Sequence, residues 1–126
     1  MTKRFGFFIA KLKMINPRSN KLYIAVLDEV PDHMVPVLVA HSVIGAHLKF
    51  FGHSVEYDDW LVNSFRKCVV KVNEKEFKKM MALDPVYVGH ENKTLGGMPS
   101  CVIVVPREDY PNVVKFAKMW APNQKD

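Results

Sequence analysis

The sequence predicts a small α/β domain with three layers, α/β/α, around a mixed four-stranded sheet in the order β-α-β-α-β-β-α. Short runs of β-branched and apolar residues alternate with segments whose apolar residues recur at helical spacing. The last two strand-like runs, 86–88 and 101–105, are joined by a connection too short for a helical crossover, so these strands are expected to be antiparallel. The earlier connections are long enough to hold helices, which we expect on both faces of the sheet.

The first strand and the long helix after it organise the domain. Residues 22–27 are apolar throughout, which is typical of a strand buried on both faces. Asp32 is expected to cap the helix, and Pro36 lies in its first turn, where a missing N–H is tolerated. The helix should run to about residue 51, before Gly52, and Gly45 suggests close packing against a neighbour. Its apolar face is expected to contain Met34, Val37, Leu38, His41, Ile44, Leu48 and Phe51.

The rest of the chain is less uniform. Residues 53–66 are expected to form a loop with a helical turn, followed by a strand at 67–72. Asn73 should cap a helix over 74–83. After the strand at 86–88 and a loop over 89–100, the strand at 101–105 leads to a last helix with Pro111 in its first turn. The apolar face of that helix is expected to contain Tyr110, Val113, Val114, Ala117 and Trp120.

Composition limits the class of protein. The chain has 126 residues, 48% of them hydrophobic, which suits one domain with one core. No apolar run approaches the ~18–20 residues of a membrane span, and no signal peptide is indicated, so a cytoplasmic protein without membrane contact is expected. Cys68 and Cys101 lie in strand-like runs and are interpreted as buried thiols, with a disulfide or metal pair as the alternative. Further ligands at suitable spacing are lacking, so neither a metal nor another cofactor is expected.

The net charge of +5 is unevenly distributed. Six cations precede Asp28, the first acidic residue, whereas the remainder carries 12 basic and 13 acidic residues, a balance of −1. We therefore expect a basic lead-in over residues 1–20, a domain over 21–122 and a tail over 123–126. The lead-in is interpreted either as a phosphate-binding arm, with Lys11, Lys13 and Arg18 as nucleic-acid contacts, or as a solubilising leader.

Three short stretches carry a family resemblance. They are Val39-Ala40-His41-Ser42 in the long helix, Lys93-Thr94 in the loop between the last two strands, and Val104-Val105-Pro106 at the end of the last strand. With the order of elements, they resemble the type II peptidyl-tRNA hydrolase superfamily over residues 21–120. The resemblance implies that family's α/β fold and, for an active member, cleavage of the ester of peptidyl-tRNA.

The sequence departs from that family where its chemistry is expected. Met34 stands where the hydrolases have a lysine, and the chain has no lysine between Lys21 and Lys49. His90-Glu91-Asn92 replaces the Asp-Ala-Gly of the hairpin loop, and the basic loop that would hold tRNA has become acidic. The chain looks more like an uncharacterised, hydrolase-like branch of the superfamily.

The candidate site follows from these positions. His41, Glu91 and Thr94 are the catalytic candidates, because histidine and carboxylate groups act as acids and bases and a hydroxyl with a base within reach can act as a nucleophile. Asp28, Asp32, His33 and His90 are the ligand-binding candidates, because they lie on loops expected at one edge of the sheet. The alternatives are a packed core histidine at 41 and a turn-capping hydroxyl at 94. His33 and His90, together with Glu91 and Asp32, are alternatively interpreted as a metal or acid–base cluster at that edge. The eight-residue separation of His33 and His41 excludes a zincin-like metal site.

Three functions are consistent with this pattern. The leading hypothesis is a hydrolase-like protein with a remodelled site that binds a small ligand or a protein partner. The second is an active, divergent hydrolase that binds tRNA through its basic lead-in. The third is a structural module that forms a homodimer, with Phe5, Phe7 and Phe8 covering the edge of a neighbouring copy.

Overall fold

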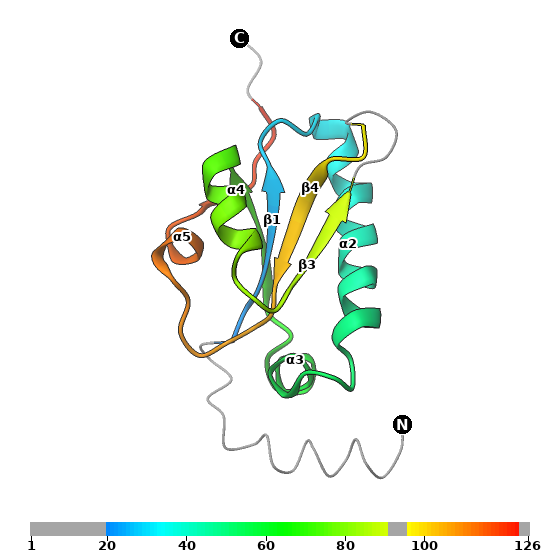
Figure 1. The fold of residues 1–126 in the computed structure, drawn as a ribbon, viewed down its shortest axis with the longest axis vertical. Coiled ribbons are helices and arrows are strands. Elements are labelled where there is room, and N and C mark those ends of the chain that lie inside the picture. Colours follow the sequence, from blue (N-terminus) through cyan, green and yellow to red (C-terminus); the bar gives the residue numbers. More distant parts are fainter. Residues whose placement is uncertain (1–19, 91–95, 124–126) are drawn as a thin grey trace.

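A computed structural model describes residues 20–90 and 96–123 of the chain. Its centre is a five-stranded mixed sheet in the order β3-β4-β1-β2-β5 (Figure 1). The central strand β1 is parallel to β2 and antiparallel to β4, while β3 pairs with β4 and β5 with β2, both antiparallel. The strands are β1 (Leu22–Leu27), β2 (Lys67–Val72), β3 (Val86–His90), β4 (Pro99–Val104) and β5 (Lys118–Met119).

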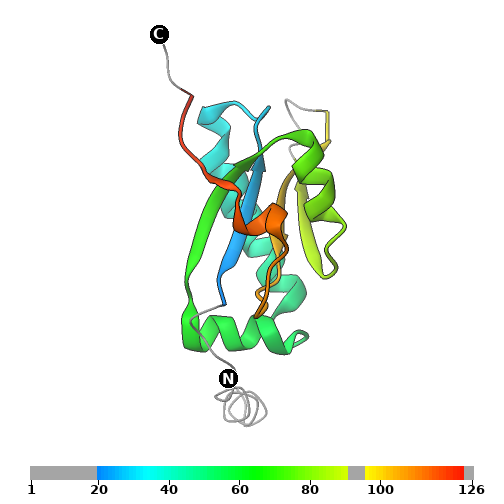
Figure 2. The same cartoon turned by 90° about the vertical axis from the view of Figure 1, so that its left-hand side faces the viewer.

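Helices cover both faces of the sheet, as predicted. Helix α2 (Val35–Phe50) packs against β3, β4 and β1. Helices α4 (Glu74–Met81) and α5 (Asn112–Lys115) lie on the opposite face (Figures 1 and 2). A short 3₁₀ helix, η1 (Asp32–Met34), leads into α2.

One further helical element closes an end of the sheet. Helix α3 (Val55–Asp59) continues directly into the π-helical segment η2 (Trp60–Ser64), where only a loop with a helical turn was expected. The pair lies below the end of the sheet at which β1 begins (Figure 1). Four of its residues, Tyr57, Asp58, Asp59 and Trp60, are buried, so this stretch is part of the core rather than a surface connection.

The predicted four-strand count is wrong, because the C-terminal segment, for which a single helix is predicted, also contains a strand. The helix α5 ends at Lys115, and the chain then extends along β2. Met119 pairs with Val70, and the backbone N–H of Trp120 donates to the carbonyl of Val69 at 2.8 Å. The apolar spacing in this segment is compatible with either conformation, and the free edge of β2 offers backbone partners that a helix would leave unused.

The expected apolar face of α2 is also wrong in part. The residues that face the sheet are Val35, Leu38, Ser42, Ala46 and Phe50. His41 is exposed, and Val37, Ile44 and Leu48 are 60%, 61% and 76% exposed. Apolar residues occur on most sides of α2, so their spacing alone does not predict which side faces the sheet.

Small side chains explain the orientation that α2 adopts. A Cβ atom on Gly45 would lie 2.2 Å from the Tyr87 hydroxyl, and one on Gly89 would lie 2.2 Å from Ser42 Oγ. The helix therefore approaches β3 so closely that glycines are needed in both elements. The close packing expected at Gly45 is confirmed.

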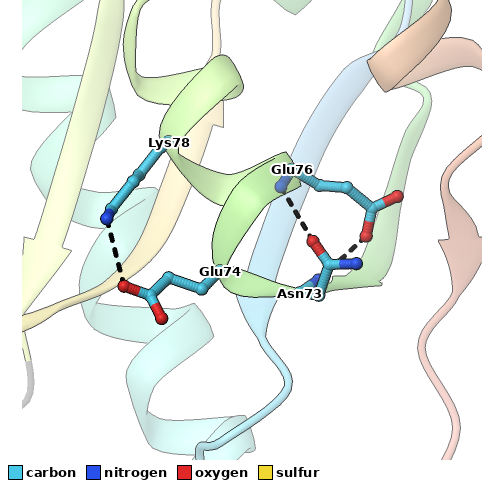
Figure 3. Close-up of polar contacts among 4 residues, drawn as sticks. All are labelled: Asn73, Glu74, Glu76 and Lys78. Carbon is cyan, nitrogen blue, oxygen red and sulfur yellow. Dashed lines mark hydrogen bonds and ion pairs between the residues drawn. The ribbon is translucent and has the colours of Figure 1, made fainter.

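The two predicted helix caps have different outcomes. Asn73 forms a full capping box with Glu76 at the start of α4, and Lys78 pairs with Glu74 on the exposed side at 3.1 Å (Figure 3). Asp32 does not cap α2, whose first residue is preceded by Met34. Its carboxylate instead accepts a hydrogen bond from the backbone N–H of Asn123 at 2.7 Å.

The outer edge of β3 carries one notable contact. Lys49, in the last turn of α2, donates from Nζ to the carbonyl oxygen of Val86 at 2.9 Å. The carbonyl of Pro85 accepts a hydrogen bond from the N–H of Val105, the residue after β4, so it points toward β4. Carbonyl groups point alternately to the two sides of a strand. The carbonyl of Val86 therefore points away from β4. Lys49 thus occupies an acceptor at the edge of the sheet.

Within residues 20–90 and 96–123, no single helix is both long and apolar enough to cross a membrane. The segments Asp32–Phe50 and Val55–Ser64 meet that test only as a pair, and they are bent by 118° at the break between them.

Candidate functional site

The ligand-binding candidates from the sequence lie at one end of the sheet. Strands β1 and β3 run in the same direction, so their carboxyl ends lie at the same edge of the sheet. Asp28 follows β1, His90 is the last residue of β3, and η1 lies at the same edge. Asp28, His33 and His90 are exposed, and Asp32 is half-buried in its contact with Asn123. In the portion of the chain that the structure describes, no three metal-binding side chains come close enough to hold an ion.

The catalytic candidates are not assembled by the described residues. His41 lies on the outer side of α2, and its expected burial against the sheet is incorrect because Ser42 takes that position. Glu91 and Thr94 lie outside the described residues, as do Lys11, Lys13 and Arg18. The predicted acid–base cluster therefore stays a prediction.

A different feature stands out at the opposite end of the domain. The second half of α2 and the α3–η2 pair enclose an apolar groove of about 250 Å³. Its walls are Val43, Ile44, His47, Leu48, Tyr57, Trp60, Leu61, Phe65 and Lys67. The exposed side chains of Ile44 and Leu48 lie on one wall, and Val37 extends the same exposed stripe along α2. We call this groove and stripe the α2 groove.

Stacked aromatic rings form the floor and one end of the α2 groove. Trp60 is 2% exposed and donates from its indole N–H to the carbonyl of Arg66 at 2.6 Å. The Phe65 ring stacks on it at a centroid distance of 5.6 Å and stays 57% exposed. Lys67 places Nζ 3.5 Å from the centre of the Phe65 ring. A cation over two stacked rings holds this wall in place.

Phe65 has a strained backbone. Its φ is 60°, in the left-handed region that a bulky side chain avoids at a cost of ~1–2 kcal/mol. The strain arises where the π-helical turn ends, with the N–H of Phe65 donating to the carbonyl of Trp60. Single π-turns and strained residues concentrate at functional sites, and here both present an aromatic ring to the groove.

Polar groups lie beneath the apolar wall. His47 Nδ1 lies 2.9 Å from the Tyr57 hydroxyl oxygen. The imidazole ring of His47 stacks on the ring of Phe51, with a centroid distance of 4.9 Å. Burial, together with the charge of Asp58, raises the pKa of Tyr57 to about 12. Burial also raises the pKa of Asp58, although the Gly52 N–H and two nearby histidines act in the opposite direction. These groups fix the position of α3 against the end of α2.

A second polar cluster fixes the point where the chain enters the domain. The buried Asp59 carboxylate accepts from the side-chain amides of Asn20 at 2.8 Å and Asn63 at 2.7 Å. Ser64 donates to the backbone carbonyl of Asn20 at 2.6 Å. Residue 20 is thereby attached to the same α3–η2 pair that forms one wall of the α2 groove.

The sequence alone does not predict this site. It indicates no role for His47, and it predicts only a loop with a helical turn over residues 53–66. One signal was available: the stretch Tyr57-Asp58-Asp59-Trp60 combines two aromatic residues with two acids. Such a mixture in a short segment requires buried hydrogen-bond partners if it folds into the core.

The two cysteines are both free, but the prediction that both are buried is confirmed only for Cys101. Cys68 is half-buried. Burial, partly offset by the Ser42 hydroxyl, raises the pKa of Cys101 to about 11, so it stays protonated at neutral pH.

A comparison with models of known protein families found no match to the chain. A search of curated proteins also found none.

Proposed function

We propose that this chain is a divergent, type II peptidyl-tRNA hydrolase-like protein that acts as a binding module for an amphipathic helical segment. The observation that carries the proposal is the α2 groove, a concave apolar surface with an aromatic floor at one end of a well-packed domain. Amphipathic helices bind such grooves through side chains at positions i, i+3, i+4 and i+7.

The shape of the α2 groove favours a helix over a compact ligand. Small-molecule sites usually enclose ~300–1,000 Å³, and the groove is slightly smaller and open along α2. The stripe from Val37 through Ile44 to Leu48 continues it as a line of exposed apolar side chains. A helix laid along this line would bury several side chains at once, which a small ligand would not.

The other end of the sheet supports a role without hydrolysis. Asp28 and Glu29 are exposed there, and Met34 stands at the position of the lysine that the family resemblance would require. Exposed carboxylates repel the phosphates of a tRNA backbone.

Two measurements on the full chain test the proposal. No turnover of peptidyl-tRNA is expected; robust cleavage that disappears in His41→Ala or Glu91→Ala would overturn the assignment. A labelled amphipathic helical peptide should bind, by fluorescence anisotropy, and Leu48→Glu should weaken its binding at least tenfold. Lys75→Glu, on the exposed side of α4, is the matched control and should leave binding unchanged.

Active hydrolysis of peptidyl-tRNA is the second candidate. It is favoured by the attachment of Asn20 to η2, because the basic lead-in then enters the domain beside Lys21 and Lys67. This function predicts tRNA affinity that falls steeply with salt, and a smaller salt slope in the Lys11→Ala/Lys13→Ala/Arg18→Ala variant. Affinity that does not depend on salt would exclude it.

A further inference from the structure

We propose that the segment bound by the α2 groove is an acidic amphipathic helix that lies beside α2, over β2, with a carboxylate against Lys67. The proposal rests on the binding role proposed for that groove and adds the charge and the position of the partner. Three observations carry it: the strands that α2 leaves uncovered, the apolar side chains that border this part of the sheet, and the charge of Lys67.

Helix α2 leaves part of its face of the sheet uncovered. It packs against β3, β4 and β1, of which β4 is the middle strand. Strand β2 lies two strands beyond β4, which is ~10 Å at ~4.8 Å per strand. The axes of two packed helices are also ~8–10 Å apart, so a second helix beside α2 would lie over β2. Among the described helices, α4 and α5 lie on the opposite face and the α3–η2 pair lies at one end of the sheet, so none takes this place (Figures 1 and 2).

Apolar side chains border this uncovered part of the sheet. On α2, Val43 is half-buried and Ile44 is exposed, and both line the groove. On β2, Lys67 lines the same groove, and Val69 points to the same face because it lies two residues further along the strand. Val69 is half-buried, and Phe65 lines the groove just before β2 begins. A helix in this position would therefore meet apolar surface on the side of α2 and on the side of β2.

Lys67 gives this surface its charge. Among the described residues that line the groove, it is the one whose side chain is always charged at neutral pH. Its Nζ lies 3.5 Å from the centre of the Phe65 ring and 5.8 Å from that of the Trp60 ring. In the part of the chain that the structure describes, no carboxylate forms an ion pair with this ammonium group. A bound helix would shield the group from water, which strengthens its attraction to a carboxylate and its repulsion of a second cation.

The next lysine on this face of β2 is already engaged. Lys71 lies four residues after Lys67 and so points to the same side of the strand. Its Nζ donates to the carbonyl of Ala121 at 2.6 Å and to the side-chain oxygen of Asn123 at 3.1 Å. The preference for an acidic partner therefore arises at Lys67, at the end of the groove that carries the Phe65 ring.

Two helical peptides with the same apolar stripe test the charge of the partner. One carries glutamate beside the stripe and the other carries lysine at the same positions, and binding to the full chain is followed by fluorescence anisotropy. The glutamate peptide should bind several-fold more tightly at low salt, and the ratio should shrink as salt is added. Lys67→Gln, which keeps most of the aliphatic stem, should remove most of this preference. Lys75→Gln, on the exposed side of α4, changes the net charge of +5 by the same amount and should leave the preference in place.

The outcomes separate this inference from the proposed function. Equal binding of the two peptides, weakened in both cases by Leu48→Ser, would overturn the acidic partner and keep the groove as a binding site. Tighter binding of the lysine peptide, or a preference for glutamate that Lys67→Gln leaves intact, would also overturn it. Binding of neither peptide would overturn both proposals, and self-association that Leu48→Ser abolishes, in sedimentation velocity, would then assign the groove to a second copy of the chain.

Spin labelling of the glutamate peptide tests the position of the helix. A nitroxide in the middle of the peptide, opposite its apolar stripe, should broaden the amide signals of Lys67 and Val69 in β2 more than those of Val86 and Tyr87 in β3. Strand β3 lies three strands from β2, ~14 Å across the sheet. Equal or greater broadening of the β3 signals would place the helix elsewhere on α2 and overturn the inference.

Discussion

The imidazole Nδ1 of His47 lies 2.9 Å from the hydroxyl oxygen of Tyr57, which joins the last turns of α2 to the first turn of α3. The bond crosses the floor of the α2 groove, so the groove has a fixed width rather than being a gap between independent helices. Tyr57 is almost completely buried and contacts the rings of Phe50 and Trp60. Four predictions follow from this end of the domain and from the close approach of α2 to β3.

Tyr57→Phe should lower the free energy of unfolding by about 1 kcal/mol, because it removes the hydrogen bond to His47 and keeps the ring. Urea denaturation of the two proteins at pH 7 measures the difference. The pKa of Tyr57 is raised to about 12 in the folded state from about 10 in the unfolded state. Its contribution is therefore complete below pH 10 and is lost as the pH rises toward 12. The gap between the two proteins should narrow over that range; a constant gap would contradict the assignment.

Asp58→Asn should raise the free energy of unfolding at neutral pH. In acid the same substitution should raise it much less. Burial raises the pKa of Asp58, so folding favours the protonated carboxyl and the charged form weakens the fold as the pH rises. The Asn amide oxygen can still accept from the Gly52 N–H, the bond that Asp58 makes at 3.0 Å. The variant's advantage should grow as the pH passes upward through the carboxylate range and then level off, as measured by thermal unfolding between pH 3 and pH 7. Glu56→Gln, an exposed change in the same helix, is the matched control variant.

Gly89→Ala should destabilise the domain by about 1–3 kcal/mol, the usual range for overpacking. The new Cβ would meet Ser42 Oγ at 2.2 Å and Ser42 Cβ at 3.3 Å, on a helix that already packs closely on β3. Ser42→Ala removes the nearer atom, so the double variant should recover part of the loss. A double-mutant cycle from denaturant unfolding checks this coupling, and strictly additive effects would show that the two positions do not collide.

Phe65→Gly should weaken peptide binding without a large change in the free energy of unfolding. The change removes the stack on Trp60 and the contact with Lys67, which together stabilise by about 1 kcal/mol, but it also relieves the strain of a positive φ by a similar amount. The free energy of unfolding should therefore stay within about 1 kcal/mol of that of the parent protein. Binding of the amphipathic peptide should nevertheless fall, because the aromatic end of the groove is gone. A large loss of stability with normal peptide binding would refute the role given to Phe65.

The sequence predicted the sheet better than the helices. The bounds of β1 and β2 match the expected strands, because each is a run of apolar or β-branched residues with polar turns beside it. The capping box at Asn73 was also recognisable, since it depends on neighbours in the chain. The alternation of strands and helices that defines an α/β domain can therefore be recognised from the composition of short segments of the sequence.

The remaining features depend on contacts between distant residues. The rotation of α2 is set by Gly45 against Tyr87 and by Ser42 against Gly89, which apolar spacing does not reveal. Strand β5 forms because β2 has a free edge, which is a property of the assembled sheet. The α2 groove combines residues 43–48 with residues 57–67, so it exists only after α3 has folded back beside α2.

The hydrogen bond from Lys49 to the Val86 carbonyl also limits how copies of this protein can associate. An incoming strand would need that carbonyl as an acceptor, and it would have to displace an ammonium group and leave a positive charge against its own backbone. Continuous intermolecular sheets, the route by which many α/β domains polymerise, are therefore disfavoured at this edge. Replacing Lys49 with a short apolar residue would remove this protection and leave the Val86 carbonyl open to an incoming strand.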